Sequence, residues 1–356
     1  DAVAALMDIT YEAYWDEVGE AFGETVPGIF TDEPNVAGGG IGAEGPWVPW
    51  TDGLAAYFEA HRGYDLLDYL PYLFLSGSRS AKTRHDFWWT ISERYTEAYS
   101  KQIGEWCEAH NLAFTGHYLS ENSLGGAIVR GGAIMPHYRY QGVPGIDMLM
   151  VQTRENLTVK QCTSVAHQFG RERVLSETYG CSGWEMTFEE QKWVGDWQYV
   201  LGVNLRCQHL ALYTLRGCRK RDYPPSFNYN TPWWKYNGAV EDYFARVGLL
   251  TTHGIAVRDV LVLHPTATGW SMVGDASDYA GGVRDADAYG ETVNAFTRAV
   301  LATHYDFDFG DEQIMAEFGR VAGEQLWINE ATYRVVVIPP GTTTMLASTF
   351  ELLQRF

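Results

Sequence analysis

The sequence predicts an α/β protein: a (β/α)8 barrel of the TIM type, incomplete at its N-terminus, over residues 1–252, then an open α/β domain over residues 253–356. Short apolar runs alternate with helical stretches, which is the pattern of parallel α/β architecture. A second strand–helix series begins near Ile255, and its spacing is typical of a doubly wound sheet.

The first part contains five apolar runs that we interpret as strands. The helix expected over Thr83–Ala109 repeats apolar side chains along one face. Thr187 and Glu190 form the pattern of a capping box at the start of another helix. The expected strands are Gly28–Thr31, Ala113–His117, Gly145–Leu149, Arg173–Glu177 and Leu210–Thr214, and the further helices are Thr158–Phe169, Thr187–Leu201 and Glu241–Leu250.

In the second part, three strands are expected to alternate with two helices, after a boundary between Thr251 and Val257. The strands are Asp259–Leu263, Tyr305–Phe309 and Arg334–Ile338, and the helices are Asp287–Thr303 and Thr343–Phe356.

The strand count falls short of a closed barrel, which needs eight strands. A barrel lacking three strands exposes two sheet edges. We therefore expect this chain to be a piece of a longer protein, with the remainder of that chain or another copy covering the edges.

Composition restricts the partners. The 26 Lys and Arg and 45 Asp and Glu residues give a net charge of −19, which disfavours nucleic acid and anionic membrane surfaces. No apolar run approaches the ~20 residues that span a bilayer. The N-terminus carries no secretory signal pattern, so a cytoplasmic location is expected. The five cysteines show no paired spacing, which argues against disulfides and zinc.

Glu33 follows an apolar run in GIFTDEPN, and barrel enzymes carry catalytic carboxylates at such strand ends. Its Asp-Glu-Pro is similar to the Asn-Glu-Pro of retaining barrel glycosidases, in which the Glu after the fourth strand is the general acid. Such an acid needs a raised pKa to protonate a departing glycosidic oxygen. An acidic loop with Pro34 as turn former is an equally good interpretation.

Glu177 ends another run, in RVLSETYGCSGW. If Gly28–Thr31 is the fourth strand of a barrel, this run is the seventh, and the two carboxylates face each other across the barrel mouth. One acid and one nucleophile or base is the arrangement that acetal hydrolysis requires. The alternative for Glu177 is a carboxylate at a helix N-terminus.

Other polar and aromatic side chains at strand ends and in loops are candidate sugar contacts. Glu121 is alternatively the base of an inverting pair or a loop charge, and Asp147 alternatively a structural hydrogen-bonding group. Loop aromatics suit the apolar face of a pyranose. Arg216, Arg219 and Arg221 either orient the carboxylates or form a salt-bridged loop. The candidate substrate-binding residues are His117, Tyr118, Glu121, His137, Asp147, Tyr179, Trp184, Gln208 and His209, and the loop aromatics are Trp47, Trp50, Tyr179, Trp184, Trp233 and Trp234.

Several of these motifs together resemble glycoside hydrolase family 106, the bacterial α-L-rhamnosidase-like proteins, over roughly residues 20–250. The part that follows looks like the flavodoxin-like domain found after the barrel in that family and in family 42 β-galactosidases. The motifs are GIFTDEPN, FTGHYLSEN, MPHYRY, GIDML, RVLSETYGCSGW and GVNLRCQHLALYTLRGCRKRDYPPSFNY.

The resemblance implies a barrel enzyme that releases a terminal sugar from a plant-type glycan or glycoside, with Glu33 as acid and Glu177 as nucleophile or base. Family 106 rhamnosidases are inverting, whereas the strand-four and strand-seven placement suggests retention. Two carboxylates need no cofactor, but some family members carry calcium near the sugar, and no metal ligand is assigned here. The alternatives are a β-galactosidase-like retaining enzyme, a non-catalytic carbohydrate-binding barrel, and an incomplete fragment of a larger glycosidase.

Overall fold

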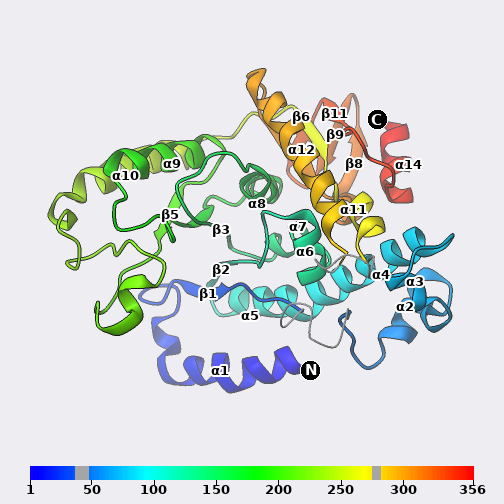
Figure 1. Cartoon of the computed structure of the whole chain (residues 1–356), viewed down its shortest axis with the longest axis horizontal. Helices are drawn as coiled ribbons and strands as arrows, with labels where there is room; N and C mark the ends of the chain where they lie inside the picture. The colour runs from blue at the N-terminus through cyan, green and yellow to red at the C-terminus, as the bar shows by residue number, and fades with distance from the viewer. Residues whose placement is uncertain (37–47, 275–281) are drawn as a thin grey trace.

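The computed structural model describes residues 1–36, 48–274 and 282–356, and its first part is built on one parallel sheet. Five strands pair in chain order, β1-β2-β3-β4-β5, as half of a barrel (Figure 1). The α/β class is confirmed. The strands are β1 (Gly28–Asp32), β2 (Ala113–His117), β3 (Val143–Met148), β4 (Leu175–Thr178) and β5 (Leu205–Gln208).

The sheet is open at both sides. Within the described residues, β1 pairs only with β2, and β5 pairs only with β4. Both edge strands carry apolar side chains that are partly exposed: Phe30 is 41% exposed and Leu205 is 37% exposed. An unpaired edge of this kind is a template for further strands.

Helices connect and cover these strands. α1 packs on α5, where the Trp106 indole donates to Glu12 at 2.6 Å. The α-helices of this part are α1 (Ala2–Val18), α2 (Leu54–Arg62), α3 (Pro71–Phe74), α4 (Ser80–Tyr95), α5 (Gln102–Ala109), α6 (Leu124–Gly131), α7 (Met135–Tyr138), α8 (Leu157–Gln168), α9 (Phe188–Val200) and α10 (Gly238–Thr251). Short helical turns are η1 (Gly19–Ala21), η2 (Leu66–Tyr69), η3 (Thr96–Lys101), η4 (Gly217–Arg221) and η5 (Trp234–Tyr236).

The long helix predicted over Thr83–Ala109 is interrupted in its middle. α4 and α5 are joined by η3, a π-helical turn. Wide turns of this kind occur often at functional sites. Here the turn brings the Ser100 hydroxyl to 2.7 Å from the Tyr118 hydroxyl and 2.8 Å from His137 Nδ1. The predicted capping box of α9 is confirmed: Thr187 N donates to Glu190 at 2.8 Å, and Glu190 N donates to Thr187 Oγ1 at 3.1 Å.

The predicted strand Leu210–Thr214 is wrong, since β5 lies earlier in the chain. Loop residues 226–228, not a neighbouring strand, hydrogen-bond to the backbone of this apolar run, and Phe227 N donates to Leu210 O at 2.8 Å. Leu212 N donates to Ser226 Oγ at 3.0 Å, and Leu212 O accepts from Asn228 at 2.7 Å. The run is therefore an ordered loop, and the β5 strand itself has an alternating polar sequence that apolar content does not detect.

The C-terminal part contains two small sheets, which lie beside α12 in Figure 1. One is parallel, in the order β11-β6-β7, and its strands match the three predicted ones within two residues at each end. The strands and helices are β6 (Val260–Leu263), α11 (Thr266–Met272), α12 (Arg284–Ala302), β7 (Phe307–Gly310), α13 (Glu312–Phe318), β11 (Val335–Val337) and α14 (Ala347–Arg355).

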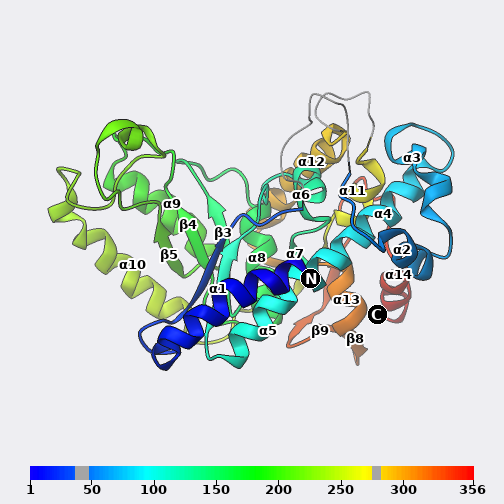
Figure 2. The same ribbon diagram turned by 90° about the horizontal axis from the view of Figure 1, so that it is seen from below.

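The second small sheet is antiparallel and was not predicted. It consists of β8 (Gly319–Ala322), β9 (Gln325–Ile328) and β10 (Ala331–Tyr333). Figure 2 shows β8 and β9 next to α13. Two-residue loops connect its strands, and their first residues, Gly323 and Asn329, have positive φ values of 63° and 48°. Glycine and asparagine tolerate this conformation, so these turns are the sequence signal for the sheet.

A buried charge network joins α8 to the C-terminal part. Arg258, 8% exposed, pairs with Asp308 at 2.7 Å and with Asp306 at 2.8 Å. Lys160, on α8, also pairs with Asp306 at 2.8 Å. Although burial opposes it, the charge of Arg258 and the hydrogen bond from His167 hold the pKa of Asp308 well below its usual range.

Replacing Arg258 with Met is expected to lower the free energy of unfolding by about 3–5 kcal/mol, because buried Asp308 would lose its guanidinium partner and keep only the hydrogen bonds from His167 and Tyr333. Arg334→Met is the control, since Arg334 is 67% exposed and lies 3.8 Å from Asp259. This substitution should lower the free energy of unfolding by less than about 1 kcal/mol. Denaturant unfolding at neutral pH measures both, and equal losses in the two variants would contradict this account. The contribution of ionised Asp308 is present above about pH 4 and is lost as the pH falls toward its depressed folded-state pKa.

Two further expectations are tested by the fold. All five cysteines are unpaired, with Cys107 and Cys162 buried and the other three exposed. Of the helices in the described residues, none has the length and apolar character needed to cross a membrane.

Candidate active site

Four ionisable side chains lie at the carboxyl ends of neighbouring strands. Glu33 directly follows β1, His117 ends β2, and Asp147 and Glu177 lie one residue before the ends of β3 and β4. The register pairs Asp147 with Glu177 and pairs Asp32, which precedes Glu33, with His117. Parallel pairing therefore brings together residues that are far apart in the sequence.

His117 and Glu177 form the closest pair of the site. His117 Nε2 lies 2.8 Å from Glu177 Oε2, and the His117 side chain is fully buried. The hydrogen bond from His117 lowers the pKa of Glu177, although partial burial opposes it, and His209, 3.8 Å away, adds to the lowering. Burial alone would lower the pKa of His117, but the hydrogen bond to Glu177 and the neighbouring carboxylates raise it to about 9.

Glu33 lies beside the same histidine, but its pKa shifts in the opposite direction to that of Glu177. Burial raises the pKa of Glu33, and the charges of Asp32 and Glu177 raise it further, against the lowering effects of His117 and Arg130. The backbone of Glu33 is left-handed, with φ of 47°. Strained backbone in a non-glycine residue is typical of functional sites.

Asp147 completes the cluster. Its pKa is raised to about 7 by burial first, and then by the charges of Glu177, Glu121 and Glu33, while His117 opposes the rise. Its Oδ1 atom is buried and has no hydrogen-bond partner among the described residues. His117 Nδ1 and His209 Nδ1 are likewise buried without a hydrogen-bond partner among the described residues.

The donor set does not fit a calcium ion. Glu33, His117 and Asp147 place one potential ligand atom each within 4.8 Å of one another. Calcium prefers about six to eight oxygen ligands, and this group supplies two carboxylates and an imidazole. His117 Nε2 is in addition already hydrogen-bonded to Glu177 Oε2 at 2.8 Å.

Glu121 lies behind the cluster and is 3% exposed. Its Oε1 accepts from Tyr118 N at 3.0 Å and from the Tyr138 hydroxyl at 2.6 Å, and its Oε2 accepts from Asp147 N at 3.0 Å. Burial raises its pKa to about 7. These bonds tie the end of β2 to β3, so Glu121 braces the two strands.

The remaining predicted contact residues differ in position. Tyr118 and His137 are buried around Ser100, and His137 is held neutral because burial lowers its pKa to about 3. Tyr179 is fully buried and donates its hydroxyl to Gln191 O at 2.8 Å. These three buried side chains are therefore not exposed to a sugar.

The others lie nearer solvent. The Trp184 indole donates to Lys220 O at 2.7 Å, and the amide of Gln208 donates to Glu241 at 3.0 Å. His209, 22% exposed, is the one of this group that the structure places beside Glu177.

The loop aromatics and arginines are spread over several segments. Trp47 lies outside the described residues. Trp50 and Trp234 are exposed, and Trp233 packs against Phe227. The exposed arginines are Arg216, Arg219 and Arg221, around the short turn η4.

Sequence reasoning missed two charges that act on the site. Asp32 lies 3.8 Å from His117, and its position directly before Glu33 was a usable signal. Arg130, at the end of α6, lowers the pKa of Glu33. No local motif indicates Arg130, because tertiary packing alone brings α6 to the loop after β1.

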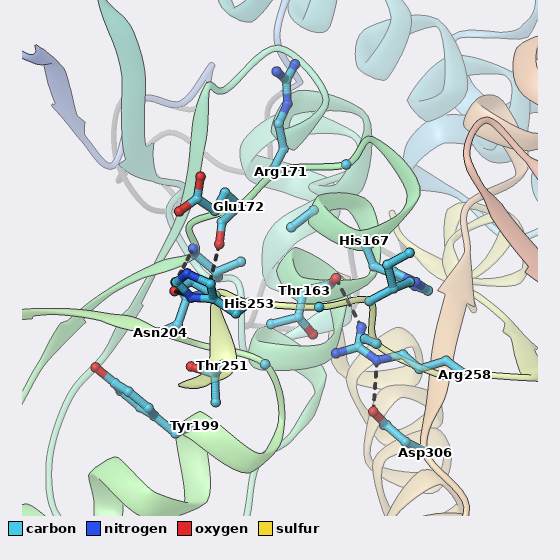
Figure 3. Close-up of a pocket in the computed structure, with 18 of the residues that line it drawn as sticks. Thr163, His167, Arg171, Glu172, Tyr199, Asn204, Thr251, His253, Arg258 and Asp306 are labelled. Atoms are coloured by element: carbon cyan, nitrogen blue, oxygen red, sulfur yellow. Dashed lines mark hydrogen bonds and ion pairs between the residues drawn. The ribbon is translucent and has the colours of Figure 1, made fainter. Parts of the chain in front are cut away.

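A cavity of about 690 Å³ lies at the opposite end of the sheet (Figure 3). Val174 and Asn204, which precede β4 and β5, line it. The ion pair of Arg258 with Asp306 lies on its wall, as Figure 3 shows. None of the predicted site residues lines this cavity, so it is separate from the carboxylate cluster.

Replacing His117 with Gln is expected to raise the pKa of Glu177 by about 1–3 pH units, because the variant loses the cation that favours the ionised carboxyl. Carbon-13 NMR titration of labelled glutamate carboxyls measures this change. His61→Gln, at an exposed position on α2, is the matched control and should leave Glu177 unchanged. The same midpoint for Glu177 in all three proteins would contradict the assigned role of His117.

The same variant tests a stability effect. The pKa of His117 in the fold, about 9, lies above the ordinary histidine value of about 6.5. Its contribution is therefore fully present below about pH 6.5 and is lost as the pH rises through about 9. The difference in free energy of unfolding between the original chain and His117→Gln, measured in urea, should therefore become smaller as the pH rises from about 6.5 to about 9.

The whole chain, residues 1–356, matches the family model of glycoside hydrolase family 106, described as alpha-L-rhamnosidase. A rhamnosidase structure from Novosphingobium sp. PP1Y is similar with a TM-score of 0.73 and 20% identity, over 99% of this chain and 32% of that one. A Formosa agariphila protein named "Putative beta-glucuronidase" is 27% identical over a 273-residue alignment, which covers 70% of this chain and 22% of that protein. The chain thus spans less than a third of the length of either relative, and the structural likeness shows a shared fold.

Proposed function

Because the chain belongs to glycoside hydrolase family 106, the alpha-L-rhamnosidase family, we propose that it hydrolyses the glycosidic bond of a terminal sugar, with Glu33 as general acid and Glu177 as base or nucleophile. One observation carries this assignment: two carboxyl groups beside His117 have pKa values displaced in opposite directions. Environments that push paired carboxyls apart are how an enzyme separates its acid from its base.

The proposed chemistry needs one protonated and one ionised carboxyl. Protonated Glu33 gives its proton to the glycosidic oxygen as the bond to the anomeric carbon breaks. Ionised Glu177 either removes a proton from an attacking water or attacks the anomeric carbon itself, and water then completes the hydrolysis. Before the reaction, protonated His117 favours the ionised form of Glu177, because it donates to Oε2 at 2.8 Å.

For the substrate we propose an α-L-rhamnoside. The support is the family description and the name of the structural relative, whereas the Formosa agariphila relative is named for a glucuronide. The unpartnered Asp147 Oδ1 suits a hydrogen bond with a sugar hydroxyl, since a buried polar atom without a partner is costly. His209 is the second candidate contact, because it is partly exposed beside Glu177.

The experiment is a panel of nitrophenyl glycosides that includes α-L-rhamnoside, β-D-galactoside and β-D-glucuronide, with the first product followed by NMR. Release of rhamnose is the expected result. An inverted anomer assigns Glu177 as base, and a retained anomer assigns it as nucleophile. Sugar binding by calorimetry without any product would contradict the proposal and favour a carbohydrate-binding barrel.

We also propose that residues 253–356 have a flavodoxin-like fold. In chain order its parallel strands are the first (β6), second (β7) and third (β11), and they lie side by side as second-first-third. That is the start of the flavodoxin-like order. The open edges of β1 and β5 support the further proposal that strands of a longer chain, or of another copy, complete the sheet.

A further inference from the structure

We propose that Asp287, on α12 of the C-terminal part, is a positioning residue for Glu33 and acts through α6. This inference depends on the proposed function, because it assigns Asp287 a part in the reaction of Glu33. It rests on contacts at the two ends of α6, a helix that follows β2 in the chain and contacts the loop after β1 through a hydrogen bond.

The N-terminal end of α6 is held by Asp287. Asp287 Oδ1 accepts from Ser123 Oγ at 2.6 Å and from Gly125 N at 2.8 Å. Ser123 is itself the N-cap of α6 and accepts from Gly126 N at 2.9 Å. The first turn of α6 leaves backbone N–H groups without helical partners, and Asp287 satisfies one of them from across the molecule.

The C-terminal end of α6 is held by the C-terminal part as well. The Trp270 indole, on α11, donates to Gly132 O directly after the helix. Trp270 is 1% exposed, so its position is fixed by packing. α11 and α12 thus clamp α6 at both ends.

The packing between these helices leaves no spare room. A Cβ atom added to Gly125 would lie 2.6 Å from Val283 O, and one added to Gly290 would lie 2.9 Å from the Cβ of Leu124. Such close approach requires glycine on both helices. A displacement of α12 is therefore transmitted to α6.

α6 in turn reaches the catalytic acid. Val36 N, three residues after Glu33, donates to Arg130 O at 2.9 Å. The Arg130 charge also acts directly on the Glu33 carboxyl, whose other charged neighbours are Asp32, His117, Asp147 and Glu177. The last turn of α6 therefore sets both the backbone after Glu33 and one of the charges around it.

The test compares Asp287→Ala with Asp285→Ala, an exposed acidic residue on the same turn of α12. Asp287→Ala is expected to lower kcat about 10- to 100-fold with KM within a few-fold, because small misplacements of a catalytic group are costly. The pKa of Glu33, measured by carboxyl NMR, should rise as Arg130 moves away. Asp287→Asn keeps an oxygen that accepts both bonds and should recover most of the activity.

Several outcomes would overturn the inference. One is that Asp287→Ala and Asp285→Ala have the same kcat and the same Glu33 pKa. Another is that the kcat of Asp287→Asn is as low as that of Asp287→Ala. If Asp287→Ala does not fold, Ser123→Ala, which removes one donor to Asp287, should still lower kcat and raise the Glu33 pKa, and no change would refute the role. If the original chain hydrolyses no glycoside, the proposed function fails, and the Glu33 pKa in the variants still shows separately whether Asp287 holds α6 and Arg130 in place beside Glu33.

Discussion

Glu177→Gln is expected to lower kcat on aryl glycosides by about 10⁴-fold, the upper end of what a positioned proton-transfer group supplies. Glutamine keeps an oxygen that accepts the hydrogen bond from His117, so the structure of the site should persist while the charge is lost. Initial rates with nitrophenyl α-L-rhamnoside measure the change.

The matched control is Glu172→Gln, an exposed position near the other end of the same strand, which should keep full activity. Thermal unfolding of both variants separates loss of chemistry from loss of fold. Unchanged hydrolysis by Glu177→Gln would remove this residue from the mechanism, and equal losses in both variants would indicate a folding defect.

Glu33→Gln is expected to produce a loss that depends on the leaving group. A general acid matters most when the departing oxygen is a strong base, so kcat should fall about 10²–10⁴-fold for a disaccharide or alkyl rhamnoside. Nitrophenolate leaves without protonation, so its glycoside should lose much less. The ratio of the two rates, in the variant and in the original chain, is the measurement.

The exposed Glu59→Gln, on α2, is the control for Glu33→Gln and should leave the ratio unchanged. The same fractional loss on both substrates would show that Glu33 does not donate the proton to the leaving group. In that case Asp147, with its pKa of about 7, would be the carboxyl to test as the acid.

The positions of the four clustered residues follow from the sequence, because apolar runs mark the strands and parallel pairing aligns their carboxyl ends. The opposite pKa shifts of Glu33 and Glu177 do not follow from local sequence. The lowered pKa of Glu177 depends on the hydrogen bond from the fully buried His117, whereas the raised pKa of Glu33 depends on the burial of Glu33 itself, and burial is a tertiary property.

Aromatic residues were the weakest basis for prediction. The sequence predicts Tyr179 at a sugar because it is one of the loop aromatics, but its side chain packs with Met186, Val194 and Phe227 in a small apolar cluster. The run Leu210–Thr214 was expected to be a strand because it is apolar, yet Tyr213 within it is 90% exposed. In both cases the surroundings of the side chain, which periodicity does not describe, decide its role.

The most direct test of the paired assignment is carboxyl NMR titration of the original chain, with the signals of Glu33 and Glu177 identified from Glu33→Gln and Glu177→Gln. The account predicts that Glu33 titrates above the ordinary range of a glutamate and Glu177 below it, so that one is the more protonated and the other ionised near neutral pH. Identical midpoints, or a higher midpoint for Glu177 than for Glu33, would contradict it.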